Sequence, residues 1–163
     1  MVILKWLLIV VAAAVVLAVL AGQLGFLQGK SPSNLGVRDG RLKPPSKTPN
    51  SVSSQAALYP DHPRLDYSRI EALALKGDGA ATLARIKTIV ESMRGAQVVK
   101  SEPGYLYAQF TTPLMKFVDD CEFWFDPAAS VIQVRSSSRV GHGDRGVNRA
   151  RIEAIRAQLA AAP

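Results

Sequence analysis

Cysteine and histidine are almost absent from this sequence of 163 residues. Cys121 is the single cysteine, which excludes an internal disulfide framework and a cysteine-based zinc cluster. His62 and His142 are the two histidines, and they leave little room for a histidine metal site. The sequence therefore predicts no metal and no other cofactor.

Recognisable catalytic motifs are lacking as well. No Gly-x-Ser-x-Gly elbow surrounds the serine run 136–138, and no Gly-Lys-Ser/Thr follows the glycines Gly141 and Gly143. The chain also has no internal repeat and no glycosylation sequon. These absences leave enzyme activity undecided, and they favour a domain that is not an enzyme.

Charge is spread unevenly along the chain. Residues 1–27 hold one charged side chain, Lys5, whereas residues 28–57 hold five basic residues and one acidic residue. Residues 58–163 hold 14 basic and 12 acidic residues, so most of the net charge of +7 lies in the middle part. Basic residues beside an apolar run more often face lipid headgroups than nucleic acid, so we expect no nucleic-acid partner.

The run from Trp6 to Leu27 contains 22 residues and no charge. As a helix it would rise about 33 Å, against about 30 Å for the hydrocarbon core of a bilayer. Residues 1–27 are therefore predicted to be a transmembrane anchor or signal anchor. A cleaved signal peptide is the alternative, because residues 19–21 form a passable cleavage triplet; the apolar run, however, exceeds the usual length of about 7–15 residues.

The orientation of this anchor is not decided by charge alone. Five basic residues follow the apolar run in residues 28–57, which by the positive-inside rule favours a cytoplasmic domain. The rule weakens for long translocated segments, and a short N-terminal segment followed directly by an apolar run resembles an export signal. We favour a single-pass protein of the inner (cytoplasmic) membrane with its domain on the periplasmic side.

Residues 28–57 are rich in Pro, Ser and Gly and nearly free of large apolar side chains. Such a segment cannot bury enough surface to order itself, and Pro44, Pro45 and Pro49 favour extended backbone. We therefore expect a basic, semi-rigid linker that spaces the globular domain from the membrane.

Residues 58–163 predict one globular α+β domain. Helical spacing of apolar residues marks 79–94 and 145–161, with Asp78 and Asp144 as N-caps. The β-rich runs 97–112, 117–126 and 131–140, separated by turn residues, predict an antiparallel β-meander of about four to five strands. Both helices should pack on one face of this sheet. Residues 69–75 fit either a strand or a helical turn.

Alternation along the strands divides the side chains between two faces. The apolar face, which includes Phe117 and Cys121, should lie under the helices, with Cys121 as a buried inert thiol. Asp119 at the start of its strand would then need a partner, for which Arg149 or Asn148 is a candidate. The opposite face is expected to be open, and its candidate functional residues are Tyr107, Asp120, Glu122, Trp124, Arg135 and Arg139.

Paired carboxylates such as Asp120 and Glu122 can perform acid–base work or hold a hard cation. Cross-strand ion pairing with Arg135 and Arg139 is the simpler interpretation. A second candidate site is the Gly-His-Gly-Asp loop before the last helix, which could cradle an anion but fits a plain turn better. The candidate residues of this turn and helix-cap loop are His142, Asp144, Asn148 and Arg149.

Three segments, residues 117–123, 131–141 and 144–156, resemble the domain-of-unknown-function family number 1499. Residues 49–54 resemble the N-terminal signature of that family, at Asn50, Ser51, Ser53 and Ser54. Many members have cysteine where Ser51 stands, so any role of that thiol is absent here. The resemblance implies a bacterial or plastid protein, often exported or membrane-attached, and it implies no activity.

The sequence as a whole favours a membrane-tethered small domain of unknown biochemical activity, a binding or structural module of the cell envelope. It would bind a protein partner through its open sheet face, and the sequence does not name the ligand. The alternative is a small hydrolase-like envelope enzyme that uses the Asp120/Glu122 and Arg135/Arg139 cluster. A deep pocket in which these groups converge would favour the enzyme, and a shallow aromatic-lined face would favour binding.

Overall fold

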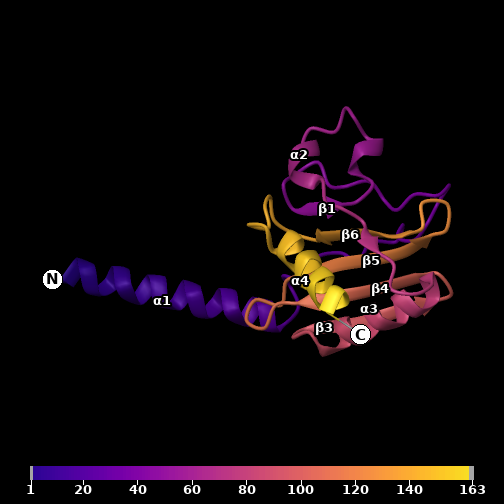
Figure 1. The fold of residues 1–163 in the computed structure, drawn as a ribbon. Coiled ribbons are helices and arrows are strands. Elements are labelled where there is room, and N and C mark those ends of the chain that lie inside the picture. The colour runs from indigo at the N-terminus through magenta and orange to yellow at the C-terminus, as the bar shows by residue number, and fades with distance from the viewer. Residues whose placement is uncertain (1, 162–163) are drawn as a thin grey trace.

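The structure, a computed structural model, describes residues 2–161 and has the predicted α+β architecture (Figure 1). A long N-terminal helix, α1 (Val2–Gln23), projects from a body built on one sheet. The other elements are β1 (Ser51–Ser53), η1 (Ala56–Leu58), α2 (Leu65–Ser68), β2 (Leu73–Ala74), α3 (Gly79–Ser92), β3 (Ala96–Glu102), β4 (Tyr105–Thr111), β5 (Val118–Asp126), β6 (Val131–Ser138) and α4 (Val147–Ala161).

The sheet is antiparallel throughout, with the strand order β1-β6-β5-β4-β3. Strand β2 also pairs with β6, opposite residues 131–132, while β1 pairs with residues 135–137. Two short segments from early in the chain therefore share one edge of the meander. The β-rich runs and the turn residues between them predict this meander, and the structure confirms it.

Local signals position the helices as expected, with small shifts at their ends. The Asp78 carboxylate accepts a hydrogen bond from the backbone N–H of Ala81 at 2.7 Å and so caps α3. Asp144 accepts from the backbone N–H groups of Gly146 and Asn148. Arg145 and Gly146 both have positive φ, so α4 begins at Val147 rather than at Arg145.

The main core lies between one face of the sheet and the helices α3 and α4, which cover that face side by side (Figure 1). Phe117, which the sequence places on the apolar face, lies just before β5 with 37% of its surface exposed, and Val147 at the start of α4 is half exposed. The buried members from α3, α4 and the strands β4 to β6 are Leu83, Ile86, Val90, Leu106, Ala108, Phe110, Cys121, Phe123, Ile132, Val134, Ile152, Ile155 and Leu159.

The other face of the sheet is covered rather than open, which corrects the expectation for it. Residues 30–46, here named the strap, lie against this face. Leu42 is buried against Tyr105 and Tyr107, and its N–H donates to Gln55 Oε1 at 2.8 Å. Leu35 and Val37 pack on the same small cluster.

The expected linker is thus largely part of the folded body, which begins well before residue 58. Residues 51–53 form β1 and are buried, and the strap packs as described above. The composition argument failed because the apolar surface that the strap buries belongs to Tyr105, Tyr107 and Trp124, far along the chain. A segment without a core of its own can still be ordered by a surface that another segment supplies.

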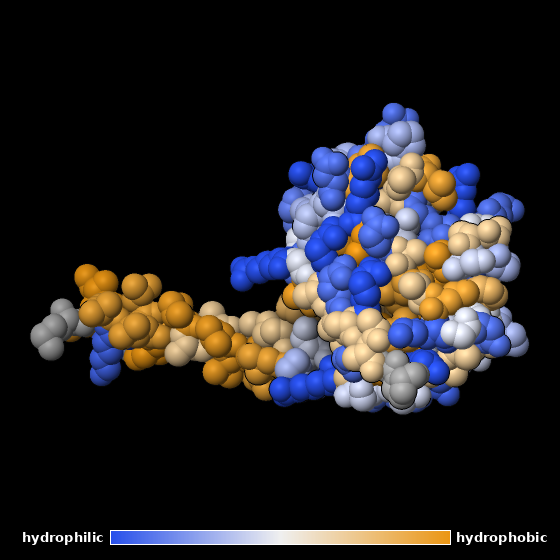
Figure 2. Space-filling view, viewed as in Figure 1, coloured by the Kyte–Doolittle hydropathy of each residue, from blue (hydrophilic) through white to orange (hydrophobic). Residues whose placement is uncertain are grey.

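Among the described residues, α1 is the one helix long and apolar enough to cross a membrane, a test that an N-terminal signal sequence also passes. Figure 2 shows it as a largely apolar rod beside a body with much polar surface. Its last residue is fixed to the body, because the Gln23 side-chain amide donates to the carbonyl oxygens of Pro113 (3.3 Å) and Leu114 (2.8 Å).

The burial of α4 yields a first prediction. Ile155 is fully buried in the main core, so Ile155→Ala should lower the free energy of unfolding by about 2–5 kcal/mol. Val147→Ala removes apolar atoms from the same helix at a half-exposed position. This variant should change the free energy of unfolding by no more than about 0.5 kcal/mol. Denaturant unfolding of the detergent-solubilised chain measures both; equal effects would mean that α4 is peripheral to the core.

Candidate functional site

The predicted charged cluster forms, but it is buried. Asp120 and Glu122 lie on β5, and Arg135 stands directly opposite Glu122 on β6. Asp120, Glu122 and Arg135 are each at most 4% exposed, and Arg139 follows at the end of β6. Cross-strand ion pairing, the favoured interpretation, is what the structure shows, although not on a solvent-exposed surface.

Glu122 receives hydrogen bonds from three directions. Its Oε1 accepts from the Tyr105 hydroxyl at 2.7 Å and from the backbone N–H of Gly36, in the strap, at 2.8 Å. Its Oε2 lies 3.4 Å from Arg135 Nη1. Arg135 Nε in turn donates to the carbonyl oxygen of Pro44, also in the strap, at 3.3 Å. The strap therefore completes this pair.

Asp120 is held in a similar way at the neighbouring position. Arg139 binds it with two nitrogens, Nη2 to Oδ1 at 2.7 Å and Nε to Oδ2 at 2.9 Å. The Tyr107 hydroxyl also donates to Oδ1, at 2.5 Å. Arg139 Nη2 reaches Ser31 Oγ of the strap at 3.5 Å, so this pair too connects sheet and strap.

Burial changes the acidity of the groups around these carboxylates. It raises the pKa of Tyr107, and the hydrogen bond to Asp120 raises it further. Burial likewise raises the pKa of Tyr105 beside Glu122, so both phenols stay neutral donors. Every carboxylate oxygen of Asp120 and Glu122 already accepts a hydrogen bond, so both acids are held in structural ion pairs.

Trp124, another of the predicted face residues, is partly buried and packs on the same small cluster as Leu35 and Val37 of the strap. It is therefore not an open aromatic platform. The shallow binding face that the sequence suggested does not exist, because the strap occupies it.

The turn and helix-cap loop mainly joins parts of the fold. Asn148 is fully buried, and its amide donates to the carbonyl oxygen of Asn50 and to Asp144. Arg149 Nη2 donates to the carbonyl oxygens of Tyr67 and Arg69. His142 is exposed.

Asp144 itself is held in its ionised form. Burial alone would raise its pKa, but hydrogen bonds from the Tyr67 hydroxyl and from the N–H groups of Asn148 and Gly146 outweigh burial and lower the pKa. Its role is to cap α4 and to hold Tyr67 near that helix.

The signature segment forms the edge of the sheet. Asn50 Nδ2 donates to the carbonyl oxygen of Gly141, and Ser51 Oγ accepts from the backbone N–H of Ser46 in the strap. Ser53 is buried in β1, and Ser54 Oγ donates to Gln133 Oε1 at 2.7 Å. These residues connect the strap, β6 and the loop after β6.

Asp119 has a different partner from the two that were expected. Arg151, on α4, binds its carboxylate at 2.6 Å and stacks over the Phe110 ring. Helical spacing could have identified this partner of Asp119 from the sequence, because Arg151 lies three residues after Asn148 and so on the same face of the helix. Cys121 is fully buried, and burial raises the pKa of its thiol to about 12, as an inert thiol requires.

Two adjoining cavities remain where the strap crosses the sheet, and sequence reasoning missed the strap cations that line them, because it treated residues 28–57 as a linker. One of about 460 Å³ lies between strap and β6; we name it the basic cleft. Its charged lining residues are Lys30, Lys43, Asp120, Arg135 and Arg139.

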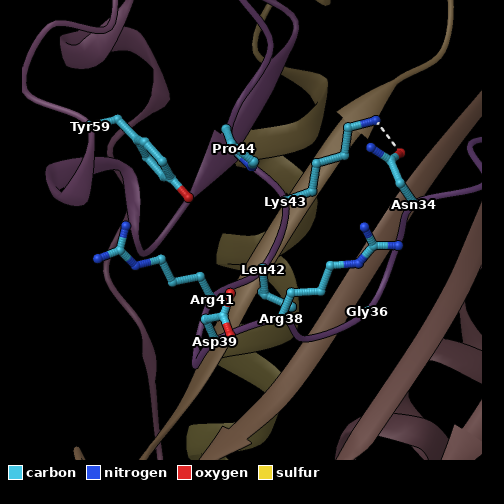
Figure 3. Close-up of a pocket in the computed structure, with 9 residues that line it drawn as sticks. All are labelled: Asn34, Gly36, Arg38, Asp39, Arg41, Leu42, Lys43, Pro44 and Tyr59. Carbon is cyan, nitrogen blue, oxygen red and sulfur yellow. Dashed lines mark hydrogen bonds between the residues drawn. The ribbon is translucent and has the colours of Figure 1, made fainter.

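The second cavity, of about 320 Å³, adjoins the basic cleft and shares Asn34, Lys43 and Pro44 with it. Figure 3 shows Arg38 and Lys43 both extending toward Asn34, whereas Arg41 extends the other way. Lys43 Nζ donates to Asn34 Oδ1 at 2.8 Å. Cations of the strap and of β6 therefore meet around one opening.

Comparison with known families gives one match. The family model described as "Protein of unknown function (DUF1499)" covers residues 41–159, which is more than half of the chain. No curated protein matches the chain. The matched region begins inside the strap and includes the sheet, α3 and nearly all of α4, but not α1.

The burial of the charged cluster leads to the second prediction. Glu122→Gln should lower the free energy of unfolding by about 3–5 kcal/mol, because it leaves Arg135 charged and unpaired in the interior. Glu102→Gln breaks the half-exposed pair with Lys100 and should cost about 0–1 kcal/mol. Chemical denaturation of both variants tests this, and a small effect of Glu122→Gln would mean that solvent reaches the pair.

Proposed function

The chain belongs to the DUF1499 family, and from that premise we propose that it is a membrane-tethered binding module that takes an anionic ligand in the basic cleft. The family's description assigns no activity, so the proposal depends on the geometry of this chain. The observation that carries it is the excess of positive charge around an opening of about 460 Å³.

The excess remains after the ion pairs are counted. Arg135 and Arg139 are balanced by Glu122 and Asp120. Within residues 2–161, neither Lys30 nor Lys43 lies within ion-pair distance of a carboxylate. The cleft therefore presents two lysine charges that an anion would neutralise.

Lys43 also supports this assignment through its surroundings. Burial lowers the pKa of its ammonium group, and the nearby positive charge of Arg135 lowers it further. A bound anion would offset the charge of Arg135 and so raise the pKa of Lys43 again. The neutral Asn34 amide that now accepts from Lys43 would remain as a polar contact at the opening.

Binding is favoured over hydrolysis by the state of the polar groups. The carboxylates already accept hydrogen bonds at every oxygen. Ser137 and Ser138 line the cleft, but no hydrogen bond joins either hydroxyl to a histidine anywhere in residues 2–161. A small anion also fits a cleft better than a protein partner does, because the strap covers the wide face that a protein would need.

The cellular setting that we propose is the one the sequence favours: the inner membrane of a bacterium, crossed once by α1, with the domain in the periplasm. The exposed apolar surface of α1 supports the membrane part of this proposal. A solute-facing cleft beside a membrane anchor suits a binding module of the cell envelope.

The anchor gives the third prediction. Full-length protein should stay with the membrane fraction after a carbonate wash, because an apolar helix of 22 residues spans the hydrocarbon core. Mass spectrometry of the washed membranes should find the intact N-terminus. Recovery of a soluble form that begins near Gly22 would show that α1 is a cleaved signal.

The ligand class gives the fourth prediction. Inorganic pyrophosphate, used as a probe anion, should raise the thermal midpoint of the purified chain, because a ligand that binds only the folded state stabilises it. Lys43→Ala should remove most of this rise. Lys87→Ala deletes one charge from the exposed surface of α3, and this variant should keep the rise in thermal midpoint. An equal rise in both variants would indicate nonspecific screening and would contradict the proposed site.

A further inference from the structure

Apolar side chains gather at the end of the sheet where α1 joins the body. Figure 1 shows the end of α1, the loop between β4 and β5 and the loop between β6 and α4 at this same end. Exposed large apolar residues come from all three of these separate regions of the chain. They are Leu24, Phe26, Leu114, Phe117 and Val147.

These segments enclose a third cavity, of about 430 Å³, which we name the foot pocket. Its polar neighbours Asp119 and Asp144 are already satisfied, the first by Arg151 and the second by Tyr67 and the start of α4. The apolar residues of its wall are Phe26, Leu27, Phe117, Val140 and Val147.

The foot pocket is held close to the end of α1. A Cβ at Gly22 would lie 2.6 Å from the carbonyl oxygen of Met115, so helix and β4–β5 loop are in direct contact. Gly29 lies close to the loop after β6, because a Cβ there would lie 2.8 Å from atoms of Arg139 and Val140. No free spacer therefore separates the helix end from this side of the body.

We propose that the foot pocket binds an acyl chain of a membrane phospholipid, which seats the domain directly on the bilayer. This inference rests on the proposed anchoring by α1. If α1 spans the bilayer, Phe26 and Leu27 lie just past its end, at the level where acyl chains meet headgroups. The pocket wall is therefore continuous with the membrane-spanning surface.

Charge at the pocket is consistent with a phospholipid. Arg145 lines it and is exposed, and Lys116 precedes Phe117 in the β4–β5 loop. Basic residues next to an apolar surface are attracted to anionic headgroups near the membrane surface. An apolar pocket with cations beside it suits a ligand that has an apolar tail and an anionic head.

Fluorescence quenching by brominated lipid tests the inference on the full chain. In a background with Trp6→Phe and Trp124→Phe, a single tryptophan is introduced by Phe117→Trp in the pocket or by Leu58→Trp on η1. Leu58 is an exposed apolar residue of comparable character that does not line the pocket. Each variant is reconstituted in phosphatidylcholine vesicles that contain some phosphatidylglycerol, with or without bromine on the acyl chains.

We expect bromine to remove most of the fluorescence of Phe117→Trp and little of that of Leu58→Trp. Adding Val147→Asp should restore most of the Phe117→Trp signal while the protein stays in the vesicles, since a charge in the wall excludes an acyl chain. Leu114→Trp, on the exposed loop, reports contact with the bilayer surface without entering the pocket.

Other outcomes would overturn the proposal in distinguishable ways. Quenching of Leu114→Trp without quenching of Phe117→Trp would mean that the loop touches the bilayer and the pocket stays free of lipid. No quenching of either in vesicle-bound protein would leave α1 as an anchor and reject the seating of the domain. If bromine does not quench the Phe117→Trp variant and its tryptophan fluorescence changes with protein concentration, a second copy of the chain occupies the pocket. Failure of the chain to enter vesicles would reject the anchor and this inference together.

Discussion

The buried ion pair of Glu122 and Arg135 is the constraint on which the second face of the sheet depends. Taking both charges out of water is costly unless their remaining donors and acceptors are also satisfied. Tyr105 supplies one donor from the sheet, but the strap supplies the other contacts, the N–H of Gly36 for Glu122 and the carbonyl oxygen of Pro44 for Arg135. The ion pair therefore needs the strap to complete its hydrogen bonds, and the strap's Gly36 N–H and Pro44 carbonyl oxygen find their partners in the pair.

This dependence gives the two faces of the sheet different roles. The face under α3 and α4 is an apolar core that fixes the fold. The face under the strap is a polar buried layer whose residual openings carry the excess positive charge. The strap also follows α1 after a few residues, so the apolar helix α1, the basic cleft and the sheet form one connected structure.

Much of the fold and part of the site could be predicted from the residues. Alternation along β5 and β6 placed Glu122 and Arg135 on one face, and Asp78 and Asp144 were identified as caps. The same reasoning failed for Asp119, whose partner is Arg151, and for the exposure of the cluster. Alternation says which side chains share a face, but it does not say what lies over that face.

Local sequence determined α3, α4 and the meander strands β3 to β6, because caps, turns and hydrophobic periods act between residues a few positions apart. It also determined the ion pairing, since β5 and β6 are joined by a short turn. Only the tertiary structure decided that residues 30–46 would be ordered, because the contact between Gly36 and Glu122 joins positions 86 residues apart. The basic cleft and the foot pocket were decided in the same way: each is lined by segments that lie far apart in the sequence and meet only when the sheet has formed.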